Sequence, residues 1–438
     1  MQKREIYKKA SKRLVALVIC LGVLLIIFLS SYQLNKKIIN IVHPSIWSRQ
    51  QAQNFVLTKE NTASNIDPNF KLAAPDLWIW DTWPLTKRDG SVATVNGYKV
   101  IFALTAPRSV DWDKRHDVAR ISCFYSEDGK HWTYKGPAYN PEDALGSRQW
   151  AGSAMLDDNG KVQFFYTATG RKGEAVITSE QRLAKTTFDI SADKNGVHLS
   201  NWSKHQVILE PDGVYYQTMQ QAKGPIIYSF RDPCFFEDPK TGKEYLLFEG
   251  NKGGDDQRLK PENIGDELFR KTHIIPPEAE NFNGNIGIAA AEDKDLTKFK
   301  LLTPLLEAAG VNQQLERPHV VIKGNQYYLF TISHRFTYAP GLNGPDGLYG
   351  FVGDSLRSNY KPLNGNGLVI TNPANDPYQT YSWYVMPGGS VLSFINEYHV
   401  NGQLRYGGTF APTLQISLTG DKSKITEELA EGVVTSSH

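Results

Sequence analysis

The chain has 438 residues, of which 40% are hydrophobic and 11% aromatic, and its formal net charge is +2. Such a chain can bury a substantial core, which excludes a disordered protein. Its basic residues are spread along most of the sequence, so it lacks the concentrated positive surface that binds nucleic acid. We therefore expect a globular protein with no nucleic acid among its partners.

The one concentrated run of positive charge lies in residues 3–13, and an uncharged apolar stretch follows from Leu14 to Ser31. This stretch just reaches the length of a bilayer span, and no small-x-small cleavage site follows it. We interpret it as an uncleaved membrane anchor; a cleaved signal peptide and a buried core helix are the alternatives. Since more positive charge precedes the segment than follows it, the remainder of the chain should face the outside, anchored or secreted.

Beyond the apolar segment, Cys123 and Cys234 are the remaining cysteines. A disulfide between them is arithmetically possible, but both lie in strand-like runs, where small buried thiols are commoner. We favour two free thiols over one bridge.

From residue 96 onward, short runs of β-branched and aromatic residues alternate with turn signals, a pattern typical of an all-β protein. Hairpins are predicted at Asn96-Gly97, Asp128-Gly129, Asn159-Gly160 and Asn401-Gly402. Residues 252–283 lack this alternation, so we expect a long surface insertion there, in a position to rim a pocket.

Three similar stretches begin at Gly160, Gly242 and Gly324, 82 residues apart each time. A period with several strands per unit favours radial repetition of small antiparallel sheets, as in a β-propeller. A sandwich or barrel with long loops is the alternative. No linker-like composition interrupts residues 70–420, so we expect one large domain.

Three short strings each place a carboxylate beside aromatic or basic neighbours. They are Trp80-Asp81-Thr82-Trp83-Pro84, Arg231-Asp232-Pro233 and Glu316-Arg317-Pro318. Retaining glycosyl transfer needs one carboxylate as the nucleophile and one carboxylic acid that protonates the leaving oxygen. The three strings therefore indicate a sugar-cleaving site.

Asp81 suits the nucleophile, because its tryptophan neighbours would offer a sugar ring an apolar wall. Asp232 suits a stabilising role, ionised beside Arg231. Glu316 suits the acid/base, with its proton affinity raised by burial and by neighbouring carboxylates. Taken singly, each has a structural alternative: a turn cap, an Arg–Asp pair at a strand end, and an exposed salt-bridged glutamate.

Together with four longer strings, these motifs resemble the levansucrase and inulosucrase family, bacterial fructosyltransferases of glycoside hydrolase family 68, and within it the Gram-negative branch. The resemblance covers roughly residues 45–420. The longer strings are Ser45-Ile46-Trp47-Ser48-Arg49, Phe248-Glu249-Gly250-Asn251, Phe330-Thr331-Ile332-Ser333-His334-Arg335-Phe336-Thr337-Tyr338 and Gly344-Pro345-Asp346-Gly347-Leu348-Tyr349-Gly350-Phe351.

The resemblance implies a five-bladed β-propeller whose axial pocket holds Asp81 as nucleophile, Asp232 as transition-state stabiliser and Glu316 as acid/base. Sucrose would give its fructosyl group to Asp81, glucose would leave with a proton from Glu316, and water, sucrose or a growing fructan would accept the sugar. No cofactor is implied. The residues implied to line the sucrose subsites are Trp80, Trp150, Arg231, Gln314, Arg317, His334 and Tyr381.

The expected organisation has five segments. They are a cytoplasmic basic tail at 1–13, a membrane anchor or signal at 14–31, a stem and N-terminal wrap at 32–55, the catalytic propeller at 56–430 and a C-terminal tail at 431–438.

The chain departs from many family members at three positions. Ala151 replaces a serine whose hydroxyl would bond near the nucleophile, and Trp383 replaces a histidine near the expected pocket. Gln313 stands where calcium-binding relatives carry an aspartate, so we expect no metal site. His334, usual in the branch that this chain resembles, favours β-2,6-linked levan, short oligosaccharides and substantial hydrolysis, unless it is only a structural imidazole.

Two alternatives to the fructosyltransferase stay open at this point. An invertase-like hydrolase would pass the same fructosyl group mainly to water. A membrane-tethered propeller that binds fructans without turnover would be expected to lack one of the three acids, and all three are present.

Overall fold

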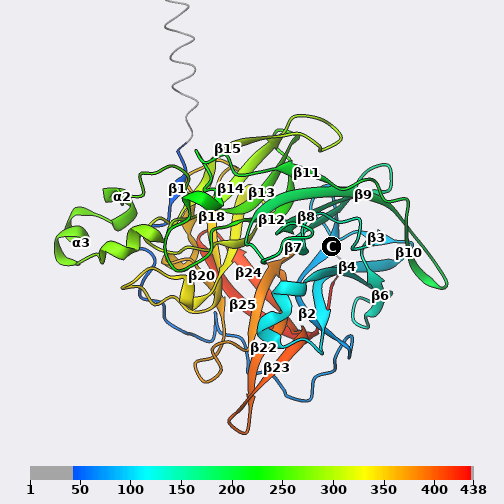
Figure 1. Ribbon diagram of the computed structural model, residues 1–438. Helices are drawn as coiled ribbons and strands as arrows, with labels where there is room; N and C mark the ends of the chain where they lie inside the picture. The colour runs from blue at the N-terminus through cyan, green and yellow to red at the C-terminus, as the bar shows by residue number, and fades with distance from the viewer. Residues whose placement is uncertain (1–42, 436–438) are drawn as a thin grey trace, which may run out of the picture. The chain divides into compact units, whose positions relative to one another are not determined.

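The computed structural model describes residues 43–435, in which strands dominate and helices are short (Figure 1). The strands of this part form four hydrogen-bonded sheets. The ten-stranded sheet consists of two four-stranded blades with short added strands, joined by parallel pairing between β2 (Leu77–Lys87) and β7 (Arg148–Leu156). The described residues therefore make five blades, as expected for a propeller.

Each blade consists of strands that follow one another in the chain and pair in antiparallel fashion, with some short strands added beside them. The first comprises β2, β3 (Thr94–Val95), β4 (Tyr98–Pro107), β5 (Arg120–Ser126) and β6 (Thr133–Pro137); the second comprises β7, β8 (Lys161–Thr169), β9 (Gln181–Asp193), β10 (Gly196–Ser200) and β11 (Gln206–Leu209). The third comprises β12 (Phe230–Asp238), β13 (Lys243–Asn251), β14 (Gly284–Ala291) and β15 (Phe299–Glu307). The fourth comprises β16 (Glu316–Lys323), β17 (Gln326–Ser333), β18 (Gly347–Gly353), β19 (Lys361–Pro362) and β20 (Leu368–Thr371). The fifth comprises β21 (Thr380–Val385), β22 (Ser390–Val400), β23 (Gln403–Phe410), β24 (Pro412–Thr419) and β25 (Lys422–Glu431).

The first strands of the blades, β2, β7, β12, β16 and β21, contact one another in a closed ring. Each of these strands has a register shift relative to the second strand of its blade, between Trp80 and Thr82 in β2 and at the corresponding place in the other four. A β-bulge bends its strand and redirects a side chain. The fivefold repeat of the bulge therefore aims side chains from different blades toward the middle of the ring.

The spacing of 82 residues has a direct structural origin. Gly160, Gly242 and Gly324 immediately precede the second strands of three consecutive blades, or stand one residue further ahead. The propeller prediction is confirmed, and the sandwich or barrel alternative is wrong.

The predicted hairpins are also present. Asn96-Gly97 joins β3 to β4 and Asn401-Gly402 joins β22 to β23, with positive φ at both central residues of each turn. This is the backbone that Asn-Gly adopts readily, and its twist matches that of the flanking strands.

The N-terminal part of the described chain belongs to the propeller. Strand β1 (Ser45–Ile46) pairs in parallel with β15, and Trp47 is fully buried against the rings of Tyr338, Tyr349 and Phe351. The fully buried Trp383 also belongs to the core, in the cluster around Trp80, and not to the pocket surface that its position in the sequence suggested.

The insertion at residues 252–283 folds into α2 (Pro261–Ile264), α3 (Glu267–Thr272) and the 3-10 turn η3 (Pro277–Asn281). Asp266 caps α3 by accepting a hydrogen bond from the backbone N–H of Phe269. None of the insertion's residues lines the main cavity described below, so the expectation that it rims that pocket is wrong.

Cys123 and Cys234 are free thiols, as favoured from the sequence. In the part of the chain that the structure describes, no helix is long and apolar enough to cross a membrane. The anchor or signal predicted at residues 14–31 lies outside the described residues.

Candidate active site

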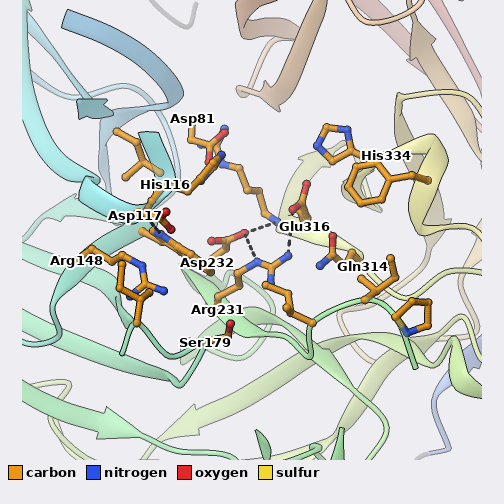
Figure 2. Close-up of a pocket in the computed structure, with 18 residues that line it drawn as sticks. Asp81, His116, Asp117, Arg148, Ser179, Arg231, Asp232, Gln314, Glu316 and His334 are labelled. Atoms are coloured by element: carbon orange, nitrogen blue, oxygen red, sulfur yellow. Dashed lines mark hydrogen bonds and ion pairs between the residues drawn. The ribbon is translucent and has the colours of Figure 1, made fainter. Parts of the chain in front are cut away.

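A cavity of about 610 Å³ opens among the first strands of four blades, within the size range of small-ligand pockets. Asp81, Asp232 and Glu316 all line it, although they come from three different blades (Figure 2). Of the other residues expected at the sugar subsites, Trp150, Arg231, Gln314, Arg317 and His334 also line it. Trp80 and Tyr381 are buried beside the cavity and do not line it.

Asp81 sits in the bulge of β2 with φ of 46°, a left-handed conformation that aspartate tolerates better than bulky residues. Burial raises the pKa of Asp81, and the nearby Glu316 raises it further. The positive charges of Arg317 and Arg115 and a hydrogen bond from Ser382 oppose that rise without cancelling it. The carboxyl group thus lies in a desolvated site with cations nearby.

Asp232 occupies the bulge of β12 with φ of 60°. Its backbone N–H donates to Oγ1 of Thr167 at 2.9 Å, and its Oδ2 accepts from the backbone N–H of Arg317 at 3.2 Å. Burial raises the pKa of Asp232 to about 7, despite the opposing charge of Arg231. From the sequence we expected the Arg231 guanidinium to keep Asp232 ionised, but burial has the larger effect on the pKa of this carboxyl group.

Glu316 is the most heavily bonded of the three acids. Arg231 Nη2 donates to Oε1 at 3.1 Å, and the Tyr381 hydroxyl donates to Oε2 at 2.5 Å. Burial pushes the pKa of Glu316 upward, but His334, Arg231 and the Tyr381 hydrogen bond outweigh it and lower the pKa overall. The expectation that Glu316 has a raised proton affinity is therefore wrong for the site without bound sugar.

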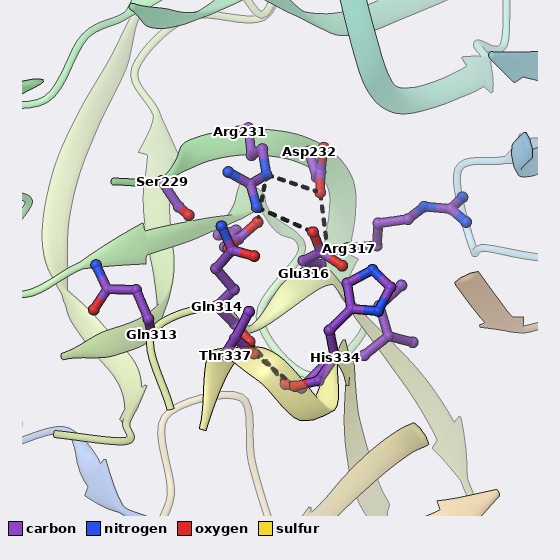
Figure 3. A network of polar contacts seen from close by, with 12 residues as sticks. Ser229, Arg231, Asp232, Gln313, Gln314, Glu316, Arg317, His334 and Thr337 are labelled. Atoms are coloured by element: carbon purple, nitrogen blue, oxygen red, sulfur yellow. Dashed lines mark hydrogen bonds and ion pairs between the residues drawn. The ribbon is translucent and has the colours of Figure 1, made fainter. Parts of the chain in front are cut away.

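Arg231 lies between the carboxylates of Asp232, Glu249 and Glu316 and contacts all three (Figure 3). In addition to the bond from Nη2 to Glu316, the Nε atom of Arg231 lies 2.8 Å from Oε2 of the fully buried Glu249. The same Nε lies 3.9 Å from Oδ2 of Asp232. An arginine held by several carboxylates in a dry site has a fixed orientation. Glu249 belongs to one of the family-like strings, but the sequence assigned it no role.

Arg317 spans the ring. Its Nη2 donates to the carbonyl of Thr82 at 2.6 Å and its Nη1 to the carbonyl of Ser382 at 3.1 Å, so the side chain links the fourth blade to the first and the fifth. Because Thr82 follows the nucleophile candidate directly, Arg317 also fixes the backbone beside Asp81.

His334 is held by Asp346, whose Oδ2 lies 2.8 Å from Nδ1, and its ring stacks on Tyr381 with centroids 3.6 Å apart. Burial opposes protonation of His334, but Asp346 and Glu316 raise its pKa overall. The imidazole is thus fixed by Asp346 and also lines the cavity. The sequence left open whether His334 is a subsite residue or a structural imidazole, and its position fits both.

The position of Ala151 lies at the bulge of β7, where its carbonyl accepts a hydrogen bond from Thr167 Oγ1 at 3.0 Å. Thr167 thereby joins the second blade to Asp232. The side chain of Gln313 is also engaged, since its Oε1 accepts the backbone N–H of Asn283 at 2.9 Å. Among residues 43–435 no cluster of three or more His, Cys, Asp or Glu side chains is arranged to hold a metal ion.

Sequence reasoning missed several residues that line the cavity. They are Leu104, His116, Asp117, Arg148, Ile177, Ser179, Pro225, Ile226, Ile227 and Phe336. His116 and Asp117 belong to a charged run in η1 (Trp112–Val118), which was the one local signal available. Phe336 lies in one of the family-like strings, but the sequence assigned it no role. The remaining residues come from loops and strands with no distinctive pattern.

The family model described as levansucrase/invertase, glycoside hydrolase family 68, matches residues 38–435. Levansucrase LscB of Pseudomonas savastanoi pv. glycinea is 39% identical over 421 residues, covering 89% of this chain and 93% of the relative. The extracellular sucrase of Zymomonas mobilis is 38% identical, covering 90% of this chain and 96% of the relative.

The structure is also similar to solved structures of an inulosucrase and a levansucrase. The inulosucrase from Halalkalicoccus jeotgali bound to kestose has a TM-score of 0.82 and 47% identity, covering 89% of this chain and 97% of that one. The levansucrase from Gluconacetobacter diazotrophicus has a TM-score of 0.77 and 33% identity, covering 90% and 92%.

Proposed function

Because the chain belongs to the levansucrase/invertase family, glycoside hydrolase family 68, we propose that it is a sucrose fructosyltransferase whose reaction is carried by Asp81, Asp232 and Glu316. The observation that carries this proposal is the convergence of three carboxyl groups from three blades on one cavity, with Arg231 hydrogen-bonded to the proposed proton donor, Glu316. A binding protein without turnover would not need this convergence.

In the first half of the reaction, the Asp81 carboxylate attacks C2 of the fructosyl group. The bond from C2 to the bridging oxygen breaks, and that oxygen takes its electron pair together with the proton of Glu316, so glucose leaves. Asp232 stabilises the positive charge that develops on the fructosyl ring and accepts hydrogen bonds from its hydroxyl groups.

In the second half, the Glu316 carboxylate takes a proton from an acceptor hydroxyl, whose oxygen attacks C2 and releases Asp81. The like charge of Glu316 raises the pKa of Asp81, and repulsion between two carboxylates acts on both partners. Formation of the ester removes the charge of Asp81, which lowers the pKa of Glu316 further. This change suits a group that must act as an acid first and as a base second.

Neutralising the nucleophile tests this mechanism. In the full chain, Asp81→Asn should lower glucose release from sucrose on the order of a thousandfold or more, since an amide cannot form the ester. Asp158→Asn is the matched control, because that side chain is 86% exposed. Initial rates of glucose release and thermal unfolding should be measured for both; near-normal release by Asp81→Asn would refute the assignment.

The fate of the fructosyl group separates a transferase from an invertase-like hydrolase. With sucrose as the single substrate, we expect free glucose in clear excess over free fructose, with oligosaccharides or polymer appearing. Equal amounts of the two monosaccharides would identify a hydrolase.

Product linkage has two candidates. The His334 position favours β-2,6-linked levan, whereas the inulosucrase at 47% identity favours β-2,1 linkages. Methylation analysis or carbon NMR of the product decides between them, because the two linkages substitute different hydroxyls of fructose.

We further propose that the enzyme acts outside the cytoplasm on sucrose and fructan acceptors, in line with the Zymomonas relative, which is named an extracellular sucrase. Membrane attachment through residues 14–31 stays a prediction, testable by fractionating cells that express the full chain.

A further inference from the structure

Building on the proposed function, we propose that Phe336 is an acceptor platform: an exposed aromatic face on which the outer sugar of a bound oligosaccharide rests while the inner sugar reacts. The ring belongs to the short turn η4 (Arg335–Thr337), directly after His334. It lines the catalytic cavity, yet the residue is 65% exposed.

Phe336 ends a continuous row of groups that begins at Glu316. The Tyr381 hydroxyl bonds Glu316, the His334 ring stacks on Tyr381, and the Phe336 ring stacks on His334 with centroids 5.0 Å apart and an interplanar angle of 21°. Glu316 must take the proton of the acceptor, so the acceptor enters beside this row. A chain of sugars that reaches Glu316 would therefore extend past His334 toward Phe336.

The mouth of the cavity is apolar where its floor is charged. Two apolar side chains, Ile177 and Ile227, also line the cavity and are 53% and 43% exposed. Large apolar side chains left exposed at a pocket mouth commonly mark a binding surface. The C–H face of a sugar ring suits an aromatic face, whereas its hydroxyl edges suit the charged floor.

This arrangement distinguishes ligands by length. Sucrose would place its fructosyl unit at Asp81 and its glucosyl unit near Glu316 and His334, which leaves it no third sugar to rest on Phe336. Kestose, which has one fructosyl unit more than sucrose, has a third sugar that extends to the platform.

Binding measured without turnover tests the platform directly. In an Asp81→Asn background, which leaves the sugar uncut, Phe336→Ser should weaken kestose binding by about threefold to tenfold and change sucrose binding less than about twofold. Phe336→Trp keeps an aromatic face and should retain kestose affinity. Leu268→Ser, at a 72% exposed apolar residue outside the cavity, is the matched control.

Calorimetric titration of the full-length variants with each sugar gives both affinities. Equal losses for sucrose and kestose would overturn the proposal, because they would mean that Phe336 acts only by holding His334. Unchanged kestose affinity in Phe336→Ser would overturn it as well.

Turnover provides an independent measurement with Asp81 intact. Phe336→Ser should lower the fraction of released fructosyl groups that is transferred to sugar by about threefold or more relative to the parent enzyme. A parallel fall in glucose release with an unchanged transferred fraction would contradict the platform. Absence of glucose release from the parent enzyme would refute the proposed function instead, and the binding comparison would still judge the platform.

Discussion

The side chains around Glu316 decide its proton affinity more strongly than its burial does. Three neighbours, Arg231, Tyr381 and His334, favour the ionised form and together lower its pKa, whereas burial alone would raise it. The effect of His334 depends in turn on Asp346, whose carboxylate keeps the imidazole protonated to higher pH. The pKa of the acid/base candidate is therefore set by residues from three blades, the third, the fourth and the fifth.

The charge of His334 gives a pH prediction. A positive charge lowers the pKa of Glu316, so its removal in His334→Gln raises that pKa and keeps the acid protonated to higher pH. The alkaline limb of the kcat/KM profile for sucrose should move upward, since that limb reports the essential acid of the free enzyme. His131→Gln, at an 89% exposed side chain, should leave the profile unchanged. An unmoved or downward limb in His334→Gln would contradict this account.

At the scale of the strand, the bulge repeated in the five inner strands positions the site. Asp81 and Asp232 adopt positive φ at the bulges of the first and third blades. Arg317 and Ser382 do the same at the bulges of the fourth and fifth blades. A regular strand would alternate its side chains between the two faces of its sheet. The bulge interrupts that alternation and orients the acids along the ring instead.

The hydroxyl of Thr167 links two of these bulges, since it donates to Ala151 and accepts from the N–H of Asp232. Thr167→Val keeps the shape but leaves both backbone groups without this partner in a fully buried place. We expect a loss of about 1–3 kcal/mol in the free energy of unfolding and slower glucose release.

Thr167→Ser is the control, because it keeps the hydroxyl and loses only a methyl group. Urea unfolding and initial rates should be compared for the three proteins. If Thr167→Ser were as impaired as Thr167→Val, packing of the methyl group and not the hydrogen bonds would be responsible.

At the scale of the whole propeller, closure joins segments distant in sequence. The first and last inner strands, β2 and β21, contact each other, and Arg317 bonds backbone groups of both. The N-terminal strand β1 adds to the third blade, and Trp47 packs against aromatic rings of the fourth. Residues before the first blade thus stabilise the side of the ring that carries Glu316.

Trp47→Ala in the full chain tests this contribution. Removing a fully buried indole should cost about 3–5 kcal/mol of stability through lost burial and the cavity left behind. Leu57→Ala, at a 40% exposed side chain nearby in sequence, should change stability by less than about 0.5 kcal/mol. Thermal and urea unfolding measure both; a small effect of Trp47→Ala would mean that the N-terminal segment is dispensable.

The strand pattern, the Asn-Gly hairpins, the spacing of the blades and the three acids could be read from the sequence. These features depend on local alternation, turn chemistry or short strings. The number of blades and the single pocket were expected from the resemblance to a known family. They follow from residues close together in the chain.

Tertiary structure alone decided how the residues act on one another. The lowered pKa of Glu316, the inclusion of Phe336 in the cavity and the burial of Trp383 in the core each depend on neighbours from other blades. Sequence proximity carries no information about such contacts, because neighbouring inner strands begin 64 to 86 residues apart, and 303 residues apart where the ring closes. Only the closed ring sets the distances between them. Coulombic interactions weaken with distance and packing contacts act only over a few ångströms, so both were set only once the propeller had brought these residues together.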